Sequence, residues 1–458
     1  MSDLTTADGL WAPSLRALAV GLVVTITIIA SESLSVITIM PIVARDLGGL
    51  RFYGWVFSSF MLASLVGIVA AGRQADRRGP AQPYSAGLLL FAAGLAVSGL
   101  APSMPVLVLG RTLQGLGAGA VPAVAYVAIG RGVPERLRPR MLALMSTAWV
   151  LPALFGPVIS AEVARQFSWR WVFLGLIPLV LSAGPLALPA LVRLGRAPGG
   201  TAEPGRAGDE HRLDHAVRTA AGAGLLLAGL IAPNLFEAVL LVGVGVLIGL
   251  PGLRRLLPAG TLVARVGLPA TILSRGLLTF GFFGCDAFVT LAVTSVRHRS
   301  PSAASIVVTA ASLTWAAGSW AQARLIDRWE GRRLVRVGLL IILSGIAGMG
   351  SALLAAVPWT VAIASWAVAG FGMGLAYSPL SLIMLREAPA GREGWAAASL
   401  NLSDVLGTAL GVGFGGAAVA ASASLGRSLG AGIAVAFVIA AGGVLAGLAA
   451  TRRLAVRG

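Results

Sequence analysis

Long apolar segments follow one another along almost the whole chain, separated by short loops that carry arginine. A helix crosses the roughly 30 Å core of a bilayer with about 20 apolar residues. Many of these segments reach that length, and charged residues make up only 12% of the sequence, against about 25% in soluble domains. Because a helix satisfies its own backbone hydrogen bonds in lipid, the sequence predicts an all-α membrane protein with many crossings.

The apolar runs predict fourteen transmembrane helices. Residues 193–216 are rich in Gly, Pro and charge, which is typical of a linker. We therefore expect a six-helix bundle at 1–192, an extra helix pair at 217–256 and a second six-helix bundle at 257–458. A re-entrant hairpin in place of the extra pair would reduce the number to twelve. The predicted helices are 16–42, 53–72, 83–101, 105–129, 140–163, 170–192, 217–233, 236–253, 268–295, 302–325, 334–356, 359–384, 395–420 and 428–450.

The basic residues are all arginine, and their placement predicts the orientation of the chain. For fourteen crossings, 26 arginines fall in loops on one side and 7 on the other. Cytoplasmic loops are the ones enriched in basic residues, so we expect both termini in the cytoplasm. This distribution accounts for the net charge of +17 without nucleic-acid binding. Arginine without lysine, beside abundant Ala and Gly, favours a GC-rich bacterium and hence its inner (cell) membrane.

Two cytoplasmic loops carry related charged sequences, and this indicates an internal repeat. An Asp-Arg pair with a glycine two or three residues after the arginine occurs in 72–79, GRQADRRG, and again in 323–333, ARLIDRWEGRR. An acid, Glu32 or Asp286, also lies in the first predicted helix of each half. Matched halves are typical of transporters built from parallel repeats. We predict that these loops bond across the halves when the cytoplasmic side closes, and the alternative is a solvated topology loop. The predicted gating residues are Gly72, Asp76, Arg77, Gly79, Asp327, Arg328, Gly331 and Arg332.

Residues 111–119, RTLQGLGAG, are similar to the fourth-helix signature of the major facilitator superfamily, and residues 72–79 resemble its first cytoplasmic signature. Residues 40–48 and 168–173 resemble the end of its first helix and the start of its sixth. Within the superfamily the chain resembles the 14-helix drug:proton antiporters of the EmrB/QacA type. The resemblance implies a major facilitator fold, with an extra helix pair between two six-helix bundles.

The fifth predicted helix departs from the exporter pattern of that superfamily. Gly156 and Pro157 match the pattern, and a proline inside a helix kinks it. We predict a hinge at this pair, with plain packing as the alternative. Ser160 and Ala161 stand where relatives have glycine, which leaves the direction of transport open.

Three acids, Glu32, Asp286 and Asp404, are predicted deep inside helices. A carboxylate at that depth costs roughly 2.5–3.5 kcal/mol on insertion scales, and burial favours the neutral form of a carboxyl. Such a group can load and release a proton, so we predict proton coupling with Glu32 as first candidate and a packing role as its alternative. Asp286 could instead bind a cationic substrate, and a bond to Arg275 in the same helix is too long to form. Asp404 could pair with Arg275 or line a cavity.

Further polar and aromatic side chains lie within the apolar runs. The resemblance implies a proton-relay or cavity role for Arg111, with snorkelling to the outer interface as the alternative. Gln114 lies one turn further on, on the same face, and could bond to substrate. An apolar pocket for a lipophilic cation could use four aromatic residues, although packing roles are the alternative. These are Phe60, Trp149, Trp315 and Tyr377.

The sequence thus predicts a proton-coupled antiporter that exports small lipophilic compounds by alternating access, in contact with membrane lipids and as a monomer. An uptake symporter, an exporter dedicated to one metabolite or lipid, and a non-transporting sensor are the alternatives. We expect no enzyme activity and no cofactor beyond protons, because no phosphate-binding loop is present. A metal site is not expected either, because His211 and His215 have no third ligand and Cys285 is the single cysteine.

Overall fold

The computed structural model describes residues 11–134, 137, 141, 144–145, 148, 150–195, 211–326, 328–389 and 393–454, and long α-helices dominate it. The N-terminal half contains α1 (Pro13–Leu47), α2 (Tyr53–Arg78), α3 (Ala81–Gly99), α4 (Met104–Gly132), α6 (Val150–Gln166), α7 (Arg170–Leu174) and α8 (Ile177–Leu194). A helix pair follows, α9 (Arg212–Leu230) and α10 (Leu235–Leu256). The C-terminal half contains α11 (Leu268–Leu291), α12 (Pro301–Leu325), α13 (Gly331–Ser351), α14 (Val361–Glu387), α15 (Glu393–Ser424) and α16 (Leu429–Ala450). Short turns are η1 (Leu50–Phe52), η3 (Thr261–Val263), the π-helical η4 (Ala292–Val296) and η5 (Thr451–Arg453).

Twelve segments of the described chain are long and apolar enough to cross a membrane, counting α7 and α8 together as one. The helices α6 and α9 are not among them. The first has 17 described residues, and the second begins with the charged sequence RLDHAVR. By length and apolarity alone, the described chain therefore has two fewer candidate crossings than the predicted fourteen.

Several helix boundaries differ from the predicted ones. The helix α2 continues to Arg78 instead of ending at 72, so Gly72, Asp76 and Arg77 lie in a helix rather than in the predicted loop. The helix α1 continues to Leu47 instead of 42, and α13 begins at Gly331, so Gly331 and Arg332 are helical, and ends at Ser351 instead of 356. The helix α9 begins at Arg212 instead of 217, so the predicted linker 193–216 is partly helical. An ion pair of 3.0 Å between Asp214 and Arg218, one turn apart, stabilises this polar first turn. The predicted helix 170–192 is interrupted between α7 and α8.

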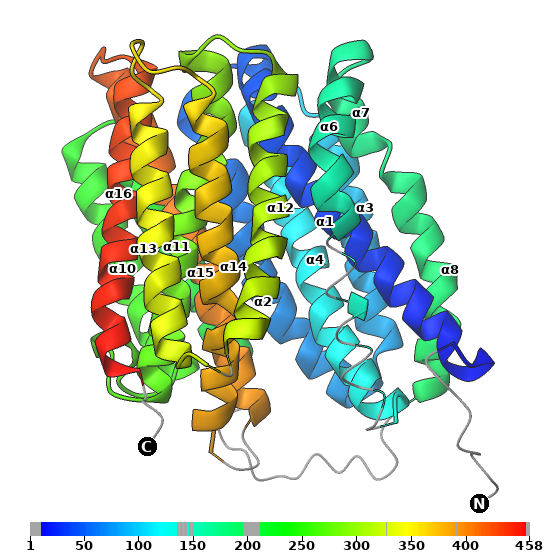
Figure 1. The fold of residues 1–458 in the computed structure, drawn as a ribbon. Coiled ribbons are helices and arrows are strands. Elements are labelled where there is room, and N and C mark those ends of the chain that lie inside the picture. The colour runs from blue at the N-terminus through cyan, green and yellow to red at the C-terminus, as the bar shows by residue number, and fades with distance from the viewer. Residues whose placement is uncertain are drawn as a thin grey trace, which may run out of the picture.

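The two halves stand side by side, with α1, α3, α4 and α6–α8 on one side of Figure 1 and α11–α16 on the other. The described chain starts in α1 and ends after α16 at the same end of the bundle, which we call the terminal end. The helix α9 packs against α10 and also contacts α2 and α15. The inserted pair therefore lies along the boundary between the halves.

Glycines bring α2 and α4 into close contact. A Cβ atom at Gly115 would collide with the carbonyl oxygen of Phe60, and one at Gly119 would collide with that of Ser64. The same arrangement joins α12 and α14, where Gly370 meets the carbonyl of Ala311. Small residues allow such close helix packing in lipid. The repeated contact shows that α2 and α4 correspond to α12 and α14.

The halves are joined by hydrogen bonds near the end opposite the terminal end. On the N-terminal side the bonding residues lie in the last third of α1 or the first turns of α2. A Cβ atom at Gly54 of α2 would lie only 2.7 Å from the Cα of Gly416 on α15. The two halves are therefore in contact at this end. The bonds run from Thr290 to the Ile37 carbonyl (2.7 Å), from Tyr53 to the Ala287 carbonyl (3.2 Å) and from Ser58 to the Ala409 carbonyl (2.8 Å).

Candidate functional site

A buried ion pair occupies the middle of the N-terminal half. Glu32 on α1 and Arg111 on α4 are 1% and 2% exposed and form a salt bridge through Nη1 of the guanidinium. The Arg111 Nε also donates to the carbonyl of Val56 on α2, at 3.2 Å. Three helices thus converge on one arginine, which lies inside the protein and does not snorkel to the interface. The pair is neutral as a unit, which lowers the cost of burying either charge.

Gln114 and Phe60 complete this cluster. Gln114 lies three residues after Arg111, and its Oε1 accepts a hydrogen bond of 2.5 Å from the guanidinium. The guanidinium carbon lies 4.3 Å from the centre of the Phe60 ring, a cation–π contact. The other polar atom of each partner, Oε2 of Glu32 and Nε2 of Gln114, is buried without a hydrogen bond in the described part of the chain. Both atoms remain able to bond to an incoming group.

The C-terminal half contains a buried acid with a different partner. Asp286 on α11 is 6% exposed and accepts a 2.7 Å hydrogen bond from the indole N–H of Trp366 on α14. Within the described residues no arginine or histidine forms an ion pair with it. Of the described side chains, one neutral donor therefore stabilises its negative charge, when that charge is present.

Glycine spacing shows that the two acids sit in corresponding places. Arg111 precedes Gly115 by four residues, and Trp366 precedes Gly370 by four, while both glycines make the same close contact with the neighbouring helix. In each half a carboxyl on the first helix meets a donor at the same position of the fourth. The donor is a charged guanidinium in one half and a neutral indole in the other.

Aromatic rings extend from Trp366 across the C-terminal half. Phe282 stacks on Trp366 with ring centres 5.1 Å apart, and it meets Trp315 edge-on at 5.6 Å. Trp315 in turn meets Tyr377 at 5.6 Å and Phe283 at 6.1 Å. Trp366 and Phe282 are buried, whereas the other three rings are half-buried. These rings come from α11, α12 and α14 and form one continuous aromatic cluster.

A second ion pair, in which Arg275 is buried and Asp404 is half-buried, lies at the other end of the aromatic cluster. Arg275 on α11 donates from Nε to Asp404 on α15 at 3.1 Å, and the Tyr377 hydroxyl donates to the same carboxylate at 2.7 Å. The Arg275 Nη1 donates to the Tyr377 carbonyl at 2.6 Å. Pairing of Asp404 with Arg275 was one of the two expectations from sequence, and this geometry confirms it. The partner of Arg275 is therefore Asp404 and not Asp286.

The family relationship follows from comparison with known proteins. A family model described as Major Facilitator Superfamily matches residues 20–412. The chain belongs to the Major Facilitator Superfamily. As members of this superfamily are transporters, the chain is a transporter rather than an enzyme, and it is a multi-pass membrane protein.

Within the superfamily, full-length similarity extends to a probable multidrug-efflux transporter of Mycobacterium tuberculosis. The two are 28% identical over 481 residues, which cover 99% of each chain. Multidrug resistance protein 3 of Bacillus subtilis is 30% identical over 191 residues, which cover 42% of this chain and 36% of that protein. An auto-inhibited POT family peptide transporter has a TM-score of 0.70 at 18% identity and covers 95% of this chain, with 98% of that chain matched. The last similarity concerns the fold alone.

Some residues predicted for this superfamily's gating loops can be placed and others cannot. Gly79 has a φ of +88°, a conformation that favours glycine, directly after α2. Arg77 and Arg328 are exposed. Of the predicted residues, Trp149, Asp327 and the side chain of Asp76 lie outside the described residues. Gly156 and Pro157 lie within α6, as predicted, and their role as a hinge stays a prediction.

Trp366 and Phe282, which connect Asp286 to the aromatic cluster, are not predicted from the sequence. A tryptophan in an apolar run is indistinguishable by composition from a lipid-facing one. A signal was present, however, in the repeat of two glycines four residues apart, at 115 and 119 and again at 370 and 374. When these two glycine pairs are aligned, Trp366 falls at the position in the second half that corresponds to Arg111 in the first.

Proposed function

We propose that this member of the Major Facilitator Superfamily is a proton-coupled antiporter that exports small lipophilic compounds, cationic ones included, across a bacterial inner membrane. The observation that carries the proposal is Asp286, a buried carboxyl with a neutral donor at the position where the other half has an arginine. The names of the two relatives, a probable multidrug-efflux transporter and a multidrug resistance protein, support export of such compounds.

Proton exchange at Asp286 follows from the cost of its charge. An unpaired carboxylate inside a membrane protein costs several kcal/mol (~2.5–3.5 on insertion scales), and a proton removes that cost. Glu32 has no such need, because Arg111 already neutralises it. The sequence alone favoured Glu32 as the proton carrier. The partners of the two acids favour Asp286, and they give the Glu32–Arg111 pair a supporting role beside it.

The charge on Asp286 is coupled to the contact between the halves through the adjacent backbone. The carbonyl of Ala287, the next residue, accepts the hydrogen bond from Tyr53 of the N-terminal half. The Tyr53 ring also lies 5.5 Å from that of Phe288. A proton gained or lost at Asp286 therefore acts within one or two residues of the contacts that hold this end closed. Rocking about these contacts gives alternating access.

The substrate binds, in this proposal, along the aromatic cluster that ends at Asp286. Half-buried Trp315, Tyr377 and Phe283 offer flat apolar surface, and ring faces attract cations. A lipophilic cation next to the ionised Asp286 would stabilise the carboxylate, so cation and proton compete for one site. That competition is what exchange requires.

All fourteen long helices cross the bilayer in this proposal, including α6 and α9. Gly222 of α9 packs directly against Gly245 and Gly249 of α10, so the two helices run together along their length. Because both ends of the described chain lie at the terminal end and arginine is concentrated in the loops on that side, we place this end in the cytoplasm.

Everted membrane vesicles test the proposal directly. Vesicles that contain the protein are energised until their lumen is acidic, and ethidium is then added as the lipophilic cation. We expect ethidium to accumulate inside while a luminal pH dye reports proton loss, and an uncoupler should abolish both signals. Ethidium uptake that leaves the pH signal unchanged would contradict antiport. Movement of ethidium out of the vesicles together with protons would indicate symport instead.

A further inference from the structure

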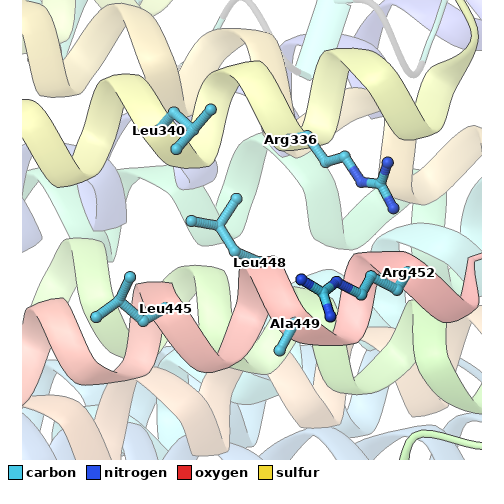
Figure 2. A pocket seen from close by; sticks show the side chains of 6 residues that line it. All are labelled: Arg336, Leu340, Leu445, Leu448, Ala449 and Arg452. Carbon is cyan, nitrogen blue, oxygen red and sulfur yellow. The ribbon is translucent and has the colours of Figure 1, made fainter.

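A groove opens on the outer face of the C-terminal half, between α13 and α16 and away from the residues of the proposed transport site. Its volume is about 420 Å³, within the range of ligand sites in proteins. Figure 2 shows two arginines at one end of the groove and leucines along the rest. The lining residues are Arg336, Leu340, Leu445, Leu448, Ala449 and Arg452.

No carboxylate in the described part of the chain neutralises the charge of the two arginines. Arg336 donates from Nε to the hydroxyl of Thr451 at 3.0 Å, a neutral partner that fixes the side chain against the end of α16. Arg452 follows directly in η5 and is exposed. Among the described residues neither arginine forms an ion pair with a carboxylate. Two guanidinium groups from different helices therefore face one opening.

The polar and apolar parts of the groove are ordered along the helix axes. Leu340 lies one turn after Arg336 on α13, and Leu445 lies seven residues before Arg452, about 10 Å deeper at 1.5 Å per residue. These leucines are 54% and 52% exposed, so they face outward from the bundle. The arginines lie at the terminal end, where α13 begins and α16 ends. The two arginines would thus lie at the depth of the lipid headgroups, and the leucines would form an apolar track at the depth of the acyl chains.

We propose that this groove binds an anionic phospholipid of the leaflet at the terminal end. The phosphate lies between Arg336 and Arg452, where two guanidinium groups can donate paired hydrogen bonds to its oxygens. One acyl chain follows the groove past Leu448 and over the deeper leucines. Basic pockets between transmembrane helices recognise anionic lipid headgroups in this way. The alternative is that these arginines only set the orientation of the chain in the membrane. That role would need neither the bond that fixes Arg336 to Thr451 nor an apolar track beside the arginines.

Native mass spectrometry of the purified full-length protein, titrated with phosphatidylglycerol or phosphatidylcholine, tests the proposal. We expect tighter retention of phosphatidylglycerol, and about 30-fold weaker retention in the double variant R336Q/R452Q. This factor corresponds to about 1 kcal/mol for each of two basic residues near an anionic lipid. The double variant R254Q/R255Q, which removes two exposed arginines of α10 at the same end, should retain the lipid as the wild type does. Equal losses in both double variants would overturn the proposal.

Two further measurements separate a lipid from a free anion and from misfolding. Leu448→Trp fills the apolar track and keeps both arginines, so it should weaken phosphatidylglycerol retention about as much as R336Q/R452Q. Inorganic phosphate in excess should displace little lipid. Displacement by phosphate, with no effect of Leu448→Trp, would make the groove an anion site and refute the lipid. Arg452→Gln alone leaves the Thr451 contact intact, and normal lipid retention in that variant would also refute the proposal.

Discussion

Asp286→Asn should uncouple transport from the proton gradient while leaving the fold intact. The asparagine oxygen can accept the hydrogen bond from Trp366 that the carboxylate accepts at 2.7 Å, and the side chain keeps its size. What is lost is the ability to hold a proton. Of the three acids predicted deep in the helices, Glu32 and Asp404 have arginine partners, so the proposed exchange involves one proton per substrate.

The expected magnitude follows from that stoichiometry. A difference of one pH unit supplies about 1.4 kcal/mol per proton, which sustains roughly a tenfold substrate gradient in an electroneutral exchange. With two pH units across proteoliposome membranes, the wild type should concentrate a monovalent lipophilic cation by up to about 100-fold, whereas Asp286→Asn should reach a ratio near one. Exchange of labelled for unlabelled cation, which needs no proton, should continue in the variant at saturating cation, with weaker cation binding because the carboxylate charge is gone.

The matched control is Glu162→Gln, which makes the same chemical change at an exposed surface carboxylate that is paired with Arg165. It should keep the wild-type gradient. If Asp286→Asn accumulates the cation as the wild type does, while Glu32→Gln reaches a ratio near one, Glu32 is the proton carrier and our reasoning from charge compensation is wrong.

Three other variants probe the contacts around the site. Arg111→Leu should destabilise the protein by about 3–5 kcal/mol, because it leaves Glu32 buried and unpaired, and thermal unfolding in detergent should show most of the loss recovered when Glu32→Leu is added. Gly54→Leu adds a Cβ atom only 2.7 Å from the Cα of Gly416 in the other half, so cation accumulation should fall at least tenfold with normal expression; unchanged transport would show that this contact does not form in the cycle. Tyr377→Phe removes the hydroxyl bond to a half-buried carboxylate and should lower stability by roughly 1.5–3 kcal/mol, as a shift in melting temperature would reveal.

The sequence was sufficient to predict the burial of the charged residues but not the complete set of their partners. Glu32, Arg111 and Gln114 sit in apolar runs, and spacing alone places the last two on one helix face. The ion pair of Glu32 with Arg111 joins positions 79 residues apart, and it depends on how α1 crosses α4. Helix crossing is decided by packing, which an apolar pattern does not encode.

The start of α9 shows a second limit of sequence reasoning. The predicted pair at 217–256 exists, but α9 starts within charged residues. A search for high mean hydropathy therefore detects only the second part of this helix. A local ion pair stabilises the first turn of α9, and the glycines of α9 pack against α10. Both are interactions between side chains or helices, and neither changes the average hydropathy from which a crossing is predicted.

The difference between the two halves has a physical consequence for a rocking transporter. If both acids lacked arginine partners, each would cost several kcal/mol when ionised, and the protein would bind two protons or be strained. If both had one, no proton would be needed, because each pair would stay neutral. In the proposed mechanism, Arg111 in one half and Trp366 in the other leave a single site, Asp286, that changes charge. That site lies beside Ala287 and Tyr53, where the halves touch, so one proton can act on the closed end without altering the fold of either half.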